Sequence, residues 1–462
     1  MGNYPDTKRK LEDSNLGEQQ EESVVELPKK KKQRTTSDYI YHTLFVNGQD
    51  SDITLVALDI EWKLHKLYLC QSNYFKSMFT GTWKESQESL IKLEIPDENI
   101  DEEALHIAFG SFYCDEVEIS SRNVVALMAV ACMFQLDGLL ANCAEMMMEN
   151  LESETVCRYY AAATQYGQQS VETKCLEWLE RRLTSSASVE LLKNIGIDLM
   201  EKLIKSPNLF VMQIEVDTYN LAKMWMFLKL NTSWKGNKKD LLSDSTTYFQ
   251  LRPGDRAFLE TEEGSKYTCV FQAVRLHHVI CDVKAVRQLD QDKIVPSDWL
   301  SSLYKQQWER MLLAYQGIDV GPSEDMPEEK FNSLAFRCGR ILEGDMQYCW
   351  RWTGFTYGVD IIVTYDSRKK YLNFKRNMYT QPCSTAICMQ LRRDIMCKVQ
   401  VAVFDTEGRE RFYRCSGLLH TSLGPDEELC ALHINEDIDY PLHVSAHIAL
   451  LGNDGGQLEQ LE

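Results

Sequence analysis

Long apolar runs, a secretory leader and metal-ligand motifs are all missing from this 462-residue sequence. No apolar stretch approaches the roughly 18 residues that a membrane-spanning helix needs, and the N-terminus is polar. None of the 15 cysteines forms a C-x-x-C pair, and the closest two, Cys383 and Cys388, have no histidine at a zinc-ligand spacing. We therefore expect no membrane span, no bound metal and no other cofactor, and we expect free thiols in a reducing compartment.

Catalytic motifs and an excess of positive charge are missing as well. The sequence contains no G-x-S-x-G, H-E-x-x-H, P-loop or Rossmann fingerprint, and its nine histidines are dispersed. These absences predict a protein that is not an enzyme. With 50 basic against 69 acidic residues the formal charge is −19, so the field of the chain repels phosphate and no direct contact with nucleic acid is expected.

Residues 1–37 differ from the rest of the chain in composition. They contain few large apolar residues and no helical or strand period, so they cannot offset the entropy of ordering, and we predict a disordered tail. A basic cluster follows Pro28 and consists of Lys29, Lys30, Lys31, Lys32 and Arg34. A short exposed run of this kind suits the acidic groove of an import receptor and predicts nuclear localisation. The alternative is a solvated charge run that no receptor reads.

Residues 38–148 have the pattern of a compact α+β domain. Period-two alternation predicts strands, and apolar residues three and four apart predict helices. Ser72 is placed to cap the second of two short helices. The predicted elements are a hairpin, the helix pair, a strand and two helical stretches: 51–57, 62–64, 65–79, 90–93, 103–113 and 123–149.

The order of residues in this domain resembles a BTB (POZ) domain. The matching positions are Asp52-Ile53, His65-Lys66, Leu69, Ser72-x-Tyr74-Phe75, Met78-Phe79 and Phe112-Tyr113. We expect a structural role for Asp52 and His65, which would orient the hairpin and the first helix. The resemblance implies a homodimer, because BTB domains of this size commonly pair through their first helix and strand.

A short segment after the Met78-Phe79 helix predicts a contact with a partner protein. Trp83-x-Glu85 resembles the apolar-x-Glu element by which some BTB domains hold cullin-3, and Tyr113 lies where a second cullin-facing aromatic is expected. An exposed aromatic ring supplies a large anchor for an interface, and a nearby carboxylate fixes the register. The alternative is a capped turn with a half-buried Trp83.

Residues 149–318 read as helical, with apolar residues three and four apart and few helix breakers. Helix pairs directly after a BTB domain resemble the BACK region of BTB adaptors. Within this region, residues 231–265 are polar with turn signals, which predicts an insertion.

The period changes from helical to two beyond the linker at Gly321-Pro322, which predicts a β-sandwich-like module over residues 330–455. The densest aromatic cluster of the chain lies here and contains Trp350, Trp352 and Phe355. Two interpretations stay open: the cluster is core, or it is a surface that recognises a protein substrate.

Over residues 40–455 the chain resembles the germ cell-less family. The matching phrases are YLCQS at 68–72, SPNLFVM at 206–212 and YCWRWTGF at 348–355. The resemblance implies a substrate adaptor of a cullin-3 ubiquitin ligase in the nucleus, at its envelope or matrix, beside a cytoplasmic pool, with a role in germ cell development and spermatogenesis. The alternative is a nuclear scaffold or transcriptional co-regulator that uses its BTB domain for pairing alone. The expected partners are cullin-3, a second copy of the chain, an import receptor and a protein substrate that the sequence does not name.

Overall fold

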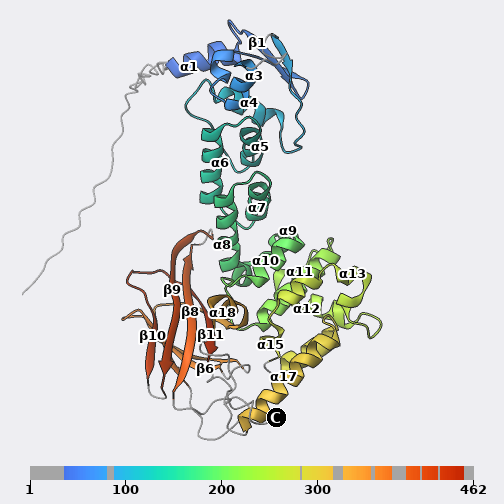
Figure 1. Ribbon diagram of the computed structural model, residues 1–462, viewed down its shortest axis with the longest axis vertical. Coiled ribbons are helices and arrows are strands. Elements are labelled where there is room, and N and C mark those ends of the chain that lie inside the picture. The colour runs from blue at the N-terminus through green and yellow to red at the C-terminus, as the bar shows by residue number, and fades with distance from the viewer. Residues whose placement is uncertain are drawn as a thin grey trace, which may run out of the picture.

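The computed structural model describes most of the chain, namely residues 36–80, 88–280, 283–315, 326–354, 359–376, 392–405, 408–424 and 427–451. The molecule is elongated, with the N-terminal α+β domain at one end and a column of helices below it (Figure 1). At the other end a second group of helices and a β module lie side by side (Figure 1). Residues 1–35 of the predicted tail, with the basic cluster, and the predicted site residues Trp83, Glu85 and Phe355 lie outside the described residues, whereas residues 36 and 37 begin α1.

The N-terminal domain is built on a three-stranded sheet of order β2-β1-β3. The predicted hairpin is confirmed, because β1 pairs antiparallel with β2, and β3 adds a parallel strand on the other side of β1. The predicted cap is confirmed too: Ser72 Oγ accepts hydrogen bonds from the N–H groups of Tyr74 and Phe75. The elements are α1 (Thr36–Ile40), a π-helical turn (Tyr41–Val46), β1 (Ile53–Ala57), β2 (Ile60–Leu64), α2 (Lys66–Leu69), α3 (Asn73–Thr80), β3 (Leu90–Lys92), α4 (Glu102–Gly110), α5 (Val124–Met133) and α6 (Asp137–Glu149).

Aromatic side chains form the centre of this domain. Phe75, Phe109 and Phe134 are fully buried, and the ring centroids of Phe75 and Phe134 lie 5.0 Å apart. The helical stretch predicted over 123–149 is two helices, because Gln135 between them adopts a positive φ of 54°. This break turns α6 back against α5 and closes the aromatic core.

A helical region follows, and one apolar core runs without interruption from Phe45 in the first domain to Leu300 near its end. The column in Figure 1 consists of α5 and α6 of the N-terminal domain and of α7 and α8 of this region, and α10 and α11 contact α8, with the other helices beyond them. The elements are α7 (Val156–Gln165), α8 (Gln169–Ser186), α9 (Val189–Asn194), α10 (Ile197–Lys205), α11 (Val216–Leu230), α12 (Lys238–Gln250), a 3₁₀ turn (Phe258–Glu260), α13 (Glu262–Ser265), α14 (Thr268–Ala273), α15 (Leu276–Val279), α16 (Val283–Asp292) and α17 (Ser297–Tyr315).

Residues 231–265, predicted to be a polar insertion with turns, contain a helix that packs on this region. Helix α12 lies among them and buries Leu241 and Phe249. Beside it lies a fully buried ion pair, in which Lys223 Nζ of α11 lies 2.8 Å from Asp292 Oδ2 of α16. Thr246 of α12 accepts a hydrogen bond from Lys223 Nζ. Most other polar residues of α12 are exposed, so the segment is a helix with one apolar face and one solvated face.

The C-terminal module confirms the predicted β-sandwich-like fold. Two four-stranded sheets, of order β10-β7-β6-β5 and β4-β11-β8-β9, enclose an apolar core, and helix α18 precedes the first strand. The hairpins β6-β7 and β8-β9 are antiparallel, as the sequence predicts. The elements are α18 (Glu328–Leu334), β4 (Phe336–Leu342), β5 (Tyr348–Gly354), β6 (Val359–Asp366), β7 (Tyr371–Arg376), β8 (Arg393–Phe404), β9 (Glu410–Leu423), β10 (Glu428–His433) and β11 (Leu442–Leu450).

Candidate functional site

The structure joins Asp52 and His65 at the start of α2. Asp52 Oδ1 accepts a hydrogen bond from the N–H of Lys66 at 2.8 Å. His65 Nε2 lies 2.9 Å from the carbonyl of Gln49, so this nitrogen carries the proton and Nδ1 is left to accept one. Nδ1 lies 3.1 Å from the hydroxyl of Tyr113, which also accepts the His65 N–H. These contacts tie the hairpin to α2.

Tyr113 is a core residue, which corrects its expected role as a cullin-facing aromatic. Its side chain is only 4% exposed, and its ring stacks on Tyr68 and Phe45 at centroid distances of 4.5 and 5.3 Å. Burial raises the pKa of Tyr113 to about 12. A partner could not use this ring as an anchor without first displacing its neighbours, so its contribution is to the fold.

Two apolar side chains are exposed on α2 and β3 of the N-terminal domain. Leu67 on α2 is 81% exposed, and Leu90 on β3 is exposed as well. The two elements meet where Lys66 Nζ donates to the carbonyl of Glu88 at 3.4 Å. An exposed apolar surface next to a polar rim is typical of a protein-binding site.

A second exposed apolar surface lies at the start of the described chain. Tyr39 of α1 is 60% exposed and Val46 of the π-helical turn is also exposed, while Phe45 between them anchors the segment in the core. The segment predicted to pair with a second copy therefore has apolar side chains available at its surface.

The aromatic cluster of the C-terminal module faces inward. Trp350 and Trp352 are 7% and 4% exposed, and the Nε1–H of Trp352 donates to the carbonyl of Gly339 inside the module. This arrangement corresponds to the core interpretation of these two indoles. A substrate surface on this module has to come from other side chains.

The main chain joins the helical region to the β module. Residues 209–214 lie along the outer edge of β4, where Ile214 forms an antiparallel bridge with Cys338 and the Gly339 N–H donates to the Gln213 carbonyl at 3.1 Å. The approach requires glycine, because a Cβ on Gly339 would lie 1.8 Å from the carbonyl oxygen of Val211. The edge of β4 is thus covered by the helical region.

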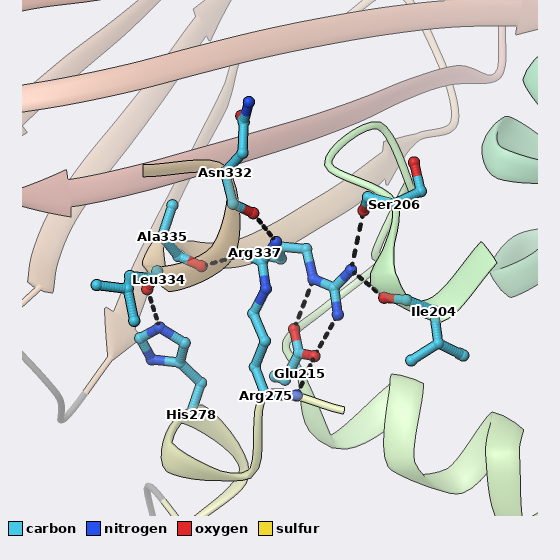
Figure 2. A network of polar contacts seen from close by, with 9 residues as sticks. All are labelled: Ile204, Ser206, Glu215, Arg275, His278, Asn332, Leu334, Ala335 and Arg337. Atoms are coloured by element: carbon cyan, nitrogen blue, oxygen red, sulfur yellow. Dashed lines mark hydrogen bonds and ion pairs between the residues drawn. The ribbon is translucent and has the colours of Figure 1, made fainter. Parts of the chain in front are cut away.

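Buried charges surround this junction (Figure 2). Arg337 of β4 forms a bidentate pair with Glu215, the residue before α11, and both side chains are fully buried. Arg337 Nη1 also donates to the carbonyls of Ile204 and Ser206. Through Arg337, strand β4 therefore contacts three residues of the helical region.

Two further side chains of the helical region reach across to α18 (Figure 2). Arg275 donates through its main-chain N–H to Glu215 and through its guanidinium to the carbonyls of Asn332 and Ala335. His278 Nε2 donates to the carbonyl of Leu334 at 2.7 Å. Donors placed at the C-terminal end of a helix satisfy carbonyls that have no partner within the helix.

Two buried arginines and one buried carboxylate set the electrostatics of the junction: the Arg337 guanidinium pairs with Glu215, and Arg275 meets Glu215 through its main-chain N–H. Burial, with Arg337 adding to it, lowers the pKa of Arg275 to about 9, so Arg275 is still charged at neutral pH. Burial lowers the pKa of His278 and of His447 on β11 well below the ordinary value, and the nearby arginines act in the same direction. Both imidazoles are therefore neutral, and Glu215 is the carboxylate on which the junction depends.

The described residues contain no group of three or more His, Cys, Asp or Glu side chains that could hold a metal ion. Among the helices described, none is both long enough and apolar enough to cross a bilayer.

Comparison with known proteins agrees with this geometry. Residues 41–151 match the family model of the BTB/POZ domain, so the chain is a BTB-domain protein. It is 47% identical over 429 residues to the human protein "Germ cell-less protein-like 1", covering 92% of this chain and 83% of the relative. It is 34% identical over 470 residues to "Protein germ cell-less" of Drosophila melanogaster, covering 96% of this chain and 82% of that protein. The chain belongs to the germ cell-less family.

Proposed function

We propose that this protein is a non-catalytic adaptor of a cullin-3 ubiquitin ligase, with the BTB domain binding cullin-3 and the β module holding a protein substrate. One observation carries the proposal: the two ends are joined by continuous buried contacts, first a shared apolar core and then the Glu215 junction. An adaptor needs this property, because a substrate is modified only where it is held at a fixed distance from the ligase.

The names of the germ cell-less relatives support a role in germ cell development, and we extend the proposal to spermatogenesis. Nuclear localisation is proposed from the cluster Lys29–Lys32 with Arg34. Replacing the four lysines with alanine should leave the protein in the cytoplasm, because import receptors read such runs through their charge. A variant that stays fully nuclear would show that the cluster is a solvated run.

Pairing of two copies is proposed from the exposed Tyr39 and Val46. Light scattering at micromolar concentration should show a dimer, and a single species of 53.5 kDa would contradict it. A dimer without cullin-3 binding would favour the second candidate function, a nuclear scaffold or co-regulator that uses its BTB domain for pairing alone.

The ligase contact is tested with purified proteins. The double variant Trp83→Ala, Glu85→Ala should bind the N-terminal helices of cullin-3 about thirtyfold more weakly, since an aromatic anchor at an interface contributes about 2 kcal/mol. The chain offers a matched control in Trp308→Ala, Glu309→Ala, which removes an exposed tryptophan and its neighbouring glutamate from α17. Equal binding by the double variant and the wild type would exclude the Trp83-x-Glu85 contact.

A further inference from the structure

A cleft of about 780 Å³ opens on the BTB domain between α1, α4 and residues 114–123. The described residues that line it include five carboxylates and neither lysine nor arginine; the carboxylates are Asp38, Glu103, Asp115, Glu116 and Glu118. Although the chain has 50 lysines and arginines, none of them is among these lining residues, so the charge of the cleft is strongly negative. The cleft therefore favours a positively charged occupant.

The floor of the cleft suits long basic side chains. Tyr41, Ile107 and Val117 line it and are half-buried. Lysine and arginine bury their methylene stems against apolar surface while the charged head stays near carboxylates and water. A floor of this kind beneath acidic walls fits Lys or Arg better than a compact cation.

The main chain on one side of the cleft has hydrogen-bond donors without main-chain partners in the part of the chain that the structure describes. Residues 116–119 belong to no helix or strand, and their N–H groups have no main-chain partner among the described residues. The preceding and following residues are held, since Cys114 Sγ donates to the Glu116 carbonyl and Asn123 Oδ1 accepts the Ser120 N–H. The carbonyl groups of an extended peptide could accept hydrogen bonds from these N–H groups.

The chain itself supplies a matching segment. Ser37 and Asp38 line the cleft, and the basic cluster ends at Arg34, two residues before the first described residue, Thr36. An extended chain spans about 3.5 Å per residue, so even Lys29 can reach about 25 Å from Thr36. Five positive charges are therefore tethered at the rim of a cleft with five carboxylates.

We propose that the segment Lys29–Arg34 docks in this acidic cleft of its own chain. Docking would regulate nuclear import, because an import receptor cannot bind the basic cluster while the cluster occupies the cleft. The docking does not depend on cullin-3 binding, whereas its effect on localisation rests on the nuclear import proposed above.

Trypsin cleavage of the full-length protein tests the docking, because trypsin cuts after Lys and Arg and needs an undocked, extended segment. The cleft variant is Asp115→Asn, Glu116→Gln, Glu118→Gln. The control variant is Glu61→Gln, Glu94→Gln, Glu98→Gln, which makes the same change of charge at exposed sites of the same domain outside the cleft. Intact mass follows cleavage at residues 29–34, and circular dichroism checks that each variant is folded.

At low salt we expect the cleft variant to be cleaved about tenfold faster than the wild type and the control variant, since three exposed ion pairs are lost. Raising the salt should bring the wild type close to the cleft variant, because exposed charges are screened. Equal rates for all three proteins at low salt would overturn the proposal. Protection that disappears on dilution would overturn it too, because the segment would then occupy the cleft of a second copy.

Discussion

The BTB domain meets the helical region through one continuous apolar core, whereas the β module meets that region through buried charges, main chain and a small apolar cluster of Phe210 with Ala402 and Phe404. At the first junction Met147, Leu151 and Tyr159 are buried in a core shared by both parts. At the second, Glu215 and Arg337 form a buried pair, and the apolar cores on the two sides are separate clusters. Apolar contact is non-directional, while a bidentate charged pair requires one geometry. The second junction thus specifies the angle at which the β module is held.

The largest effect is expected at the charged junction. Glu215→Gln keeps the shape of the side chain but leaves the buried Arg337 guanidinium without its paired carboxylate, which should cost about 3–5 kcal/mol of unfolding free energy. Chemical denaturation measures the loss. Asp255→Asn is the control: it alters an ion pair whose carboxylate is fully exposed, and it should leave the denaturation midpoint unchanged. Equal denaturation curves for Glu215→Gln and Asp255→Asn would show that the buried pair at the junction contributes no more to stability than an exposed ion pair.

A slightly smaller effect is expected at the apolar junction. Met147→Ala removes a fully buried side chain of α6 and should cost about 3 kcal/mol through lost burial and a cavity. Because one apolar core serves the BTB domain and the helical region that follows it, the two parts should lose stability together. Hydrogen exchange in α5, which belongs to the BTB domain, and in α8, which belongs to the helical region, measures this. Loss of protection in α5 alone would show that the two parts are energetically separate.

Acid should weaken the charged junction through its histidines. Burial, with a contribution from Arg182, lowers the pKa of His443 to about 4, and the pKa of His447 is also lowered by burial. The unfolded chain then binds protons that the folded state does not, so stability falls as the pH drops below about 6.5 and levels off near the folded pKa. Melting temperatures between pH 7 and 5 should fall, and His447→Gln should reduce the slope. A flat profile for the wild type would contradict the burial of these groups.

The smallest effect is expected for a polar contact at the rim of the apolar junction. Tyr166 donates to Asp97 Oδ2 at 2.8 Å and links α7 to the loop after β3. Tyr166→Phe removes this hydrogen bond and should cost about 1 kcal/mol in denaturation experiments. A loss as large as that of Met147→Ala would mean that polar contacts carry this junction as well.

Local pattern predicted much of the fold, because hairpins, helix caps and apolar periods are encoded within a few residues. The β1-β2 hairpin, the Ser72 cap and the β8-β9 hairpin are of this kind. The charged junction could not be predicted in the same way, since Glu215 and Arg337 are 122 residues apart and neither stands in a motif. Helix α12 was not predicted, because its few buried apolar residues, Leu241 and Phe249 among them, stand in an otherwise polar, exposed stretch.

The candidate site residues show the same difference between what local sequence pattern predicts and what only the tertiary fold decides. Sequence named Asp52 and His65, and the structure joins them at the start of α2, but it expected Tyr113 to face a partner and left Trp350 and Trp352 open between core and surface, whereas all three rings are buried. An aromatic residue in a motif gives no sign of its own exposure. Only the packing of distant elements decides whether the ring meets solvent.

The most direct test of the adaptor proposal is calorimetry of the purified full-length protein with the N-terminal helices of cullin-3. The account predicts saturable binding with one cullin-3 per BTB domain, and Glu215→Gln should leave this affinity unchanged because the charged junction lies at the other end of the molecule. Absence of binding at concentrations up to tens of micromolar would contradict the account.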